Sequence, residues 1–100
     1  MAEREVRVIA VLGSGPGLGA AIARRFAREG FAVALMARRE EALRPIQAEI
    51  EGAGGRAIAL AADATDPRSV HAAFARIREA LGPADVLVYN AGLYEEAEVL

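Results

Sequence analysis

The sequence contains no cysteine, no lysine and no tryptophan, and it has a single histidine, His71. Without cysteine, the chain has no disulfide, thiolate nucleophile or cysteine-ligated zinc site. Because all 12 basic residues are arginine, mechanisms that need a lysine amine on this chain are also excluded, including a P-loop lysine and a Schiff base. His71 adjoins an apolar helical stripe, so we interpret it as a surface or boundary residue. No metal site is expected.

Long apolar runs are also missing, since no stretch approaches the length of a membrane span. Arg4 and Arg7 precede the apolar run Val8–Leu12, which faintly resembles a signal peptide, but Glu3 and Glu5 contradict that pattern. The absence of cysteine fits a reducing compartment, and we expect a cytoplasmic protein with no membrane partner. The net charge is −2 and the arginines are scattered, so no nucleic-acid partner is expected.

Short apolar runs alternate with longer segments of helical periodicity. Strands are predicted over residues 6–12, 31–36, 56–62 and 85–89. The intervening helices are predicted from apolar stripes at Leu18, Ile22 and Phe26, at Leu43, Ile46 and Ile50, and at Val70, Phe74, Ile77 and Leu81. Asp66 and Pro67 mark the start of the third helix, whereas Pro45 either delays the start of the second helix or kinks it.

Continuous apolar strands joined by helices indicate a parallel sheet covered on both faces. We therefore predict an α/β fold of the Rossmann type, a doubly wound three-layer α/β/α sandwich with strand order 3-2-1-4. Ligands bind such sheets at the carboxyl ends of the strands, beside the switch point between the first and fourth strands. With 100 residues, the chain is expected to be the N-terminal part of a single domain, residues 1–100.

A glycine-rich turn joins the first strand to the first helix. Bare backbone N–H groups at a positive helix end favour a phosphate, and glycine lets the phosphate approach. The spacing GxxxGxG fits the turn better than GxGxxG, because Leu18 stands where the latter needs glycine or alanine. The candidate cofactor-binding residues of this turn are Gly13, Ser14, Gly15, Pro16, Gly17, Leu18 and Gly19.

This turn resembles the cofactor loop of the short-chain dehydrogenase/reductase family, whose usual form is TGxxxGxG. The resemblance covers nearly all of the chain and implies an oxidoreductase that transfers a hydride between a nicotinamide cofactor and a small alcohol or carbonyl substrate. It also implies a serine, a Tyr-x-x-x-Lys pair and an asparagine as catalytic groups. These are not present here, so the chain corresponds to the cofactor-binding half, the catalytic half is absent, and we expect the full-length protein to be a homo-oligomer. Leu12 and Tyr89 depart from the family pattern, which has threonine and asparagine there.

Arg38 and Arg39 follow the second strand, where an NAD-selective site places a carboxylate for the ribose 2′-hydroxyl. A guanidinium can bind a 2′-phosphate through two hydrogen bonds. The helix start is a poor place for a cation that has no ligand. The sequence therefore favours NADP over NAD, with Arg38 as the first candidate for the phosphate and Arg39 as the second.

Two further turns complete the candidate cofactor site. Asp63 and Ala64 follow the third strand, and in the family the matching aspartate contacts the adenine ring, where a carboxylate can accept from the exocyclic amine. As a residue pattern alone, Asp63 fits a turn equally well. Asn90, Ala91 and Gly92 follow the fourth strand and resemble the family's NNAG motif, whose small residues let the cofactor's ribose approach the backbone.

Two other functions remain open from the sequence. The letters GSGPG also resemble the first motif of S-adenosylmethionine-dependent methyltransferases. Those enzymes usually carry an acidic residue two positions before the first glycine, where this chain has Val11. They usually carry another at the end of the second strand, where this chain has Ala37 and Arg38. The second of these other functions is that of a non-catalytic nucleotide-binding module.

Overall fold

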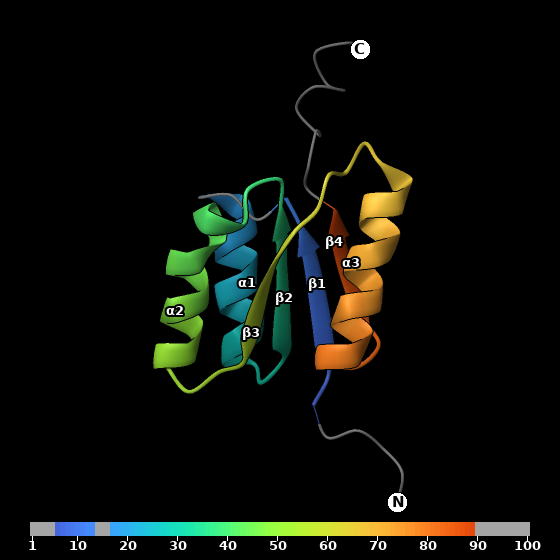
Figure 1. Cartoon of the computed structure of the whole chain (residues 1–100). Helices are drawn as coiled ribbons and strands as arrows, with labels where there is room; N and C mark the ends of the chain where they lie inside the picture. Colours follow the sequence, from blue (N-terminus) through green and yellow to red (C-terminus); the bar gives the residue numbers. More distant parts are fainter. Residues whose placement is uncertain (1–5, 14–16, 90–100) are drawn as a thin grey trace, which may run out of the picture.

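The computed structural model describes residues 6–13 and 17–89, which form a parallel sheet with helices on both faces (Figure 1). The predicted alternation of strands and helices is confirmed, and each strand ends within two residues of its predicted bounds. The elements are β1 (Val8–Leu12), α1 (Leu18–Arg28), β2 (Ala32–Ala37), the 3₁₀ helix η1 (Glu40–Leu43), α2 (Arg44–Gly52), β3 (Ala57–Ala61), α3 (Pro67–Ala80) and β4 (Val86–Tyr89).

The strand order is β3-β2-β1-β4, and every neighbouring pair is parallel. In the register of the central strands, Ala10 of β1 lies opposite Ala34 of β2 and Leu87 of β4. Because every pairing is parallel, the carboxyl ends of the strands share one end of the sheet (Figure 1). The predicted Rossmann-type topology is confirmed.

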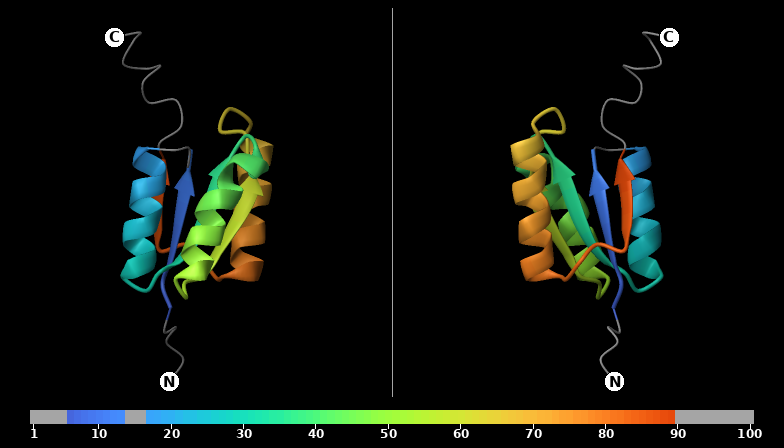
Figure 2. Two further views of the ribbon diagram at one scale, coloured as in Figure 1. Left: turned by 90° about the vertical axis from the view of Figure 1, so that its left-hand side faces the viewer. Right: turned by 90° about the vertical axis from the view of Figure 1, so that its right-hand side faces the viewer.

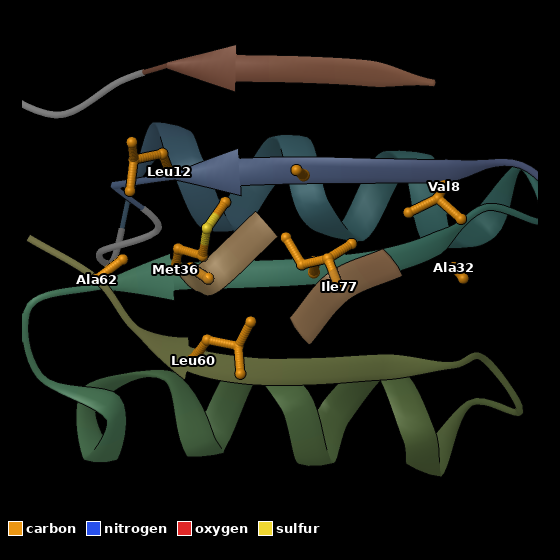
Figure 3. Packing of buried hydrophobic residues seen from close by; sticks show 10 residues of the cluster. Val8, Leu12, Ala32, Met36, Leu60, Ala62 and Ile77 are labelled. Carbon is orange, nitrogen blue, oxygen red and sulfur yellow. The ribbon is translucent and has the colours of Figure 1, made fainter. Parts of the chain in front are cut away.

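The sheet has a hydrophobic core on each face, because successive side chains of a strand point to opposite sides. α1 and α2 cover one face and α3 covers the other (Figure 2). Figure 3 shows the cluster beneath α3, where Ile77 lies over the sheet near Met36 and Leu60. Burial on both faces explains why the central strands read as unbroken apolar runs rather than as alternating patterns.

The apolar stripe predicted for α1 is wrong at its first residue, since Leu18 is 63% exposed. The helix packs on the sheet through the small residues Gly19, Ala20 and Ala23, which are buried. Small side chains let a helix approach a sheet closely, and Ile22 and Phe26 then lie half-buried at the side of the contact. The spacing of the bulky residues therefore identified the helix but not the centre of its buried face.

The structure also shows how the predictions for the start of α2 and for the buried face of α3 compare with the observed helices. Pro45 is the second residue of α2, after η1, so the late start is confirmed and the proline introduces no kink within the helix. In α3, Ile77 is fully buried with Ala73, whereas Val70, Phe74 and Leu81 lie half-buried against the same cluster. Among the helices of the described part, none combines the length and the apolarity that a bilayer crossing requires.

Candidate functional site

Three of the predicted site segments meet at the carboxyl end of the sheet. Gly13 directly follows β1, Arg38 directly follows β2, and Asp63 stands two residues after β3. Because β1, β2 and β3 are parallel neighbours, these segments lie side by side (Figure 1). The remaining predicted residues lie outside the described part of the chain, namely Ser14, Gly15, Pro16, Asn90, Ala91 and Gly92.

The two described ends of the glycine turn both have positive φ angles. Gly13 has a φ of 93°, and its N–H donates to the carbonyl oxygen of Met36 at 2.7 Å, which ties the end of β1 to β2. Gly17 has φ 108° and ψ −130°, a conformation that is essentially confined to glycine. A Cβ added to Gly17 would meet no atom of the described chain within 4 Å. The backbone conformation, rather than crowding, therefore requires glycine here and leaves open space beside it.

Among the described residues, none caps the N-terminus of α1 with its side chain, and the first turn of the helix contains no acidic residue. The first N–H groups of a helix have no acceptor within the helix, and together with the helix dipole they attract an anion. At α3 the corresponding need is met within the chain, because the Asp66 carboxylate accepts from the N–H of Arg68 at 3.0 Å. The described residues thus leave α1, and not α3, with an end suited to an anionic ligand.

Arg38 and Arg39 are both exposed and form no ion pair with any described residue. The Arg38 guanidinium lies near enough to Asp63 to contribute to lowering the pKa of that carboxyl group. Arg39 occupies the N-cap position of η1 in an extended conformation and offers no side-chain cap. The structure therefore brings Arg38 and Asp63 together at the ends of adjacent strands.

Asp63 is held by hydrogen bonds on two sides. Its N–H donates to Ser69 Oγ at 2.8 Å, and its Oδ1 accepts from Thr65 N at 3.0 Å and Thr65 Oγ1 at 2.7 Å. The Thr65 hydroxyl is the largest cause of the lowered pKa of Asp63, followed by the Thr65 N–H, while desolvation opposes the shift. Thr65 and Ser69 were not singled out from the sequence. An aspartate two residues before a threonine is a signal of such turns that could have identified Thr65.

The described residues also bear on whether the site could hold a metal ion or use a catalytic histidine. Within residues 6–13 and 17–89, no group of three or more His, Cys, Asp or Glu side chains could hold an ion. His71 is exposed on α3, as expected for a surface residue. The polar groups present are backbone amides, a guanidinium and a carboxylate, which suit recognition of phosphates and a base rather than metal chemistry.

A parallel sheet of this order, with a glycine-rich turn between the first strand and the first helix, is typical of nucleotide-binding α/β domains. The chain belongs to the short chain dehydrogenase family, whose profile matches residues 7–100. A putative ketoacyl reductase of Streptomyces coelicolor is 40% identical over 92 residues, 92% of this chain and 35% of the relative. The short-chain reductase protein NovJ of Streptomyces niveus is 42% identical over 93 residues, 93% of this chain and 36% of the relative.

Solved structures agree with this assignment. A metagenomic short-chain oxidoreductase in complex with NADP superposes with a TM-score of 0.81 at 41% identity, over 87% of this chain and 39% of the other. An actinorhodin polyketide ketoreductase with NADPH superposes with a TM-score of 0.83 at 40% identity, over 92% of this chain and 35% of the other. The chain therefore spans little more than a third of the length of these relatives.

Proposed function

We propose that this chain is the cofactor-binding half of an NADP(H)-dependent oxidoreductase acting on a small alcohol or carbonyl substrate. The observation that carries the proposal is the meeting of three groups at the carboxyl ends of adjacent strands: a helix start that no described side chain caps, an exposed guanidinium and a carboxylate. Family membership supports the reaction class, and the NADP and NADPH complexes of similar structures support the cofactor.

The described residues fit a dinucleotide phosphate. The open space beside Gly17 and the first N–H groups of α1 suit the pyrophosphate, because a Cβ would project into that space. Asp63 suits the adenine amine, and the Ala64 N–H, which donates to no acceptor among the described residues, suits the neighbouring ring nitrogen.

We propose that residues 14–16 complete the phosphate loop and that Asn90, Ala91 and Gly92 line the nicotinamide-side ribose. When bound, the nicotinamide supplies or accepts the hydride.

Selectivity for NADP over NAD is proposed to depend on Arg38. An aspartate or glutamate at this position would repel a 2′-phosphate, whereas an exposed arginine can bind it through two charge-assisted hydrogen bonds. Arg39 is the second candidate. The absence of a carboxylate here also weighs against a methyltransferase, which would need one for the ribose hydroxyls.

Catalysis itself is proposed to depend on residues outside these 100. The proton-transferring pair that the resemblance implies needs a lysine to lower the pKa of a tyrosine, and this chain has none. Tyr94 cannot form such a pair, because the fourth residue after it is Glu98. We also propose a cytoplasmic location, which the lack of cysteine supports, and a homo-oligomeric state of the full-length protein.

The proposed cofactor preference can be tested on the complete protein with Arg38→Asp. We expect the affinity for NADPH to fall by about 1.5–3 kcal/mol more than the affinity for NADH, because a charge-assisted hydrogen-bond pair is lost. Isothermal titration with both cofactors measures the difference.

Arg76→Asp provides the matched control. Arg76 is exposed in the middle of α3 and forms no ion pair with a described residue, so the charge change is the same but remote from the site. An equal loss for both cofactors in Arg38→Asp would remove Arg38 from the phosphate site. Failure of the wild-type protein to bind either dinucleotide, with binding of S-adenosylmethionine instead, would reject the proposed function.

A further inference from the structure

The loop from β3 to α3 holds Asp63 between the sheet and the helix. The N–H of the preceding residue, Ala62, donates to the carbonyl oxygen of Ala37 at 2.8 Å, which continues the β2–β3 pairing by one residue. On the other side, the Asp63 N–H donates to Ser69 Oγ in the first turn of α3. The backbone of Asp63 is thereby fixed to both layers at the carboxyl end of the sheet.

Thr65 fixes the side chain of Asp63. Both of its donors, the N–H and the hydroxyl, are used on the same oxygen, Oδ1. A threonine hydroxyl has one proton to donate, so Thr65 Oγ1 is committed to Asp63. Among the described residues, no donor contacts the second oxygen, Oδ2. The carboxylate plane is therefore held from one side while the other oxygen remains available to a ligand.

The chemistry of this arrangement favours one kind of ligand atom. Two donors on Oδ1 stabilise the ionised carboxylate, which can only accept hydrogen bonds. The lowered pKa of Asp63, with Thr65 as the leading cause and Arg38 as a further one, agrees with this. An acceptor-only oxygen attracts an exocyclic amino group and repels an exocyclic carbonyl oxygen.

We propose that Thr65 is a positioning residue that, by orienting the Asp63 carboxylate, makes the site select a purine with a 6-amino group over one with a 6-oxo group. The inference rests on the proposed function, since it requires a dinucleotide at this end of the sheet. It adds a cause of base selectivity that lies outside the residues expected to contact the base. Thr65 itself is exposed and acts only through Asp63.

The experiment compares NADPH with its deaminated analogue, in which hypoxanthine replaces adenine, on the complete protein. We expect wild type to bind NADPH about tenfold more tightly or better, because a charge-assisted hydrogen bond is replaced by repulsion. Thr65→Val keeps the shape and the backbone N–H but removes the hydroxyl. It should reduce the preference by about threefold to tenfold, chiefly through weaker binding of NADPH. Thr65→Ser restores a hydroxyl and should restore the preference to within about twofold of wild type.

The outcomes separate the inference from the proposed function. If wild type prefers NADPH but Thr65→Val weakens both ligands equally, Thr65 supports only the loop and the inference is wrong. The inference is also wrong if Thr65→Val leaves the preference intact, if Thr65→Ser fails to restore it, or if wild type binds both ligands equally. If wild type binds neither ligand, the proposed function fails and the inference falls with it. Should Thr65→Val fold poorly in thermal melts, Thr65→Ala removes the same hydroxyl and is judged by the same ratio.

Discussion

The two ends of the sheet use the same residue type in opposite ways. At the amino end, Asp85 joins the segment before β4 to β1. Its Oδ2 accepts from Val8 N at 2.8 Å, and its own N–H donates to the carbonyl oxygen of Val8 at 2.8 Å. At the carboxyl end, Asp63 uses Oδ1 within its own loop, and no described residue contacts its Oδ2. One aspartate continues the β1–β4 pairing, and the other presents an acceptor at the surface.

The surroundings of the two aspartates repeat this contrast. Near the amino end, Phe26 and Phe31 stack edge to face with centroids 5.0 Å apart, and the Arg7 guanidinium lies 5.4 Å from the Phe31 ring centre. At the carboxyl end, Leu18 and Arg38 are exposed, and no described side chain caps the start of α1. Within the described chain, the amino end satisfies its own groups and the carboxyl end presents them outward. Stability and binding should therefore be separable by mutation.

The largest separation is expected from a pair of glycines. Gly17→Ala places a side chain at φ 108°, and we expect a strain of about 1–3 kcal/mol together with a fall in NADPH affinity on the order of 100-fold, because phosphate donors are misdirected. Gly55→Ala, near the amino end, would bring a Cβ within 2.9 Å of Ile50 Cγ2 and 3.1 Å of the Ile50 carbonyl oxygen. It should cost about 1–3 kcal/mol of stability and leave affinity unchanged.

Chemical denaturation and cofactor titration of both glycine variants measure the two quantities. If Gly55→Ala weakened NADPH binding as much as Gly17→Ala does, stability and binding would not be separated between the two ends of the sheet.

A smaller effect, confined to stability, is expected from Asp85→Ala. Val8 is fully buried, so loss of the carboxylate leaves its N–H without this acceptor and should cost about 1–3 kcal/mol. NADPH affinity should stay within about twofold of wild type, because the change lies at the opposite end of β1 from the proposed site. Urea unfolding and cofactor titration check the two statements. A large loss of affinity in a folded Asp85→Ala protein would contradict the separation.

The smallest effect is a pH-dependent one at Asp63. Its pKa is lowered in the folded protein, so its carboxylate stabilises the fold above the ordinary aspartate range and loses that contribution as the pH falls through the folded pKa. Asp63→Asn should therefore melt below wild type at about pH 7, with the gap narrowing toward about pH 3. Melting curves at both pH values measure the gap, and a gap that does not change with pH would contradict the assignment.

The sequence predicted the fold well because burial on both faces makes the central strands continuous apolar runs. Asp66 also marked the start of α3 correctly, since it occupies the N-cap position and its side chain accepts from Arg68 N. Leu18 was placed wrongly, because helical spacing cannot distinguish the centre of a buried face from its margin when the closest contact is made by glycine and alanine. Pro45 was ambiguous, because a 3₁₀ turn before a helix has no distinct apolar period.

The candidate site was predicted less completely than the fold. Gly13 and Gly17 could be singled out because a positive φ angle favours glycine, and Arg38 because it stands where an NAD-selective site needs a carboxylate. Their roles in binding a cofactor stay predictions. The Asp-x-Thr spacing could have pointed to a turn at Thr65, but it does not say whether the threonine hydroxyl bonds to the aspartate side chain. Such partnerships require the loop geometry, and here they depend on the distance between Thr65 Oγ1 and Asp63 Oδ1.

The unequal capping of α1 and α3 has a consequence for how the folded protein responds to its surroundings. α3 carries its own capping carboxylate, so its first turn should hold at any ligand concentration. No described residue plays this part at α1, and an anion arriving from solution would supply the negative charge only in the folded state. The melting temperature should then climb with cofactor concentration, and hydrogen exchange should slow first in the opening turn of α1.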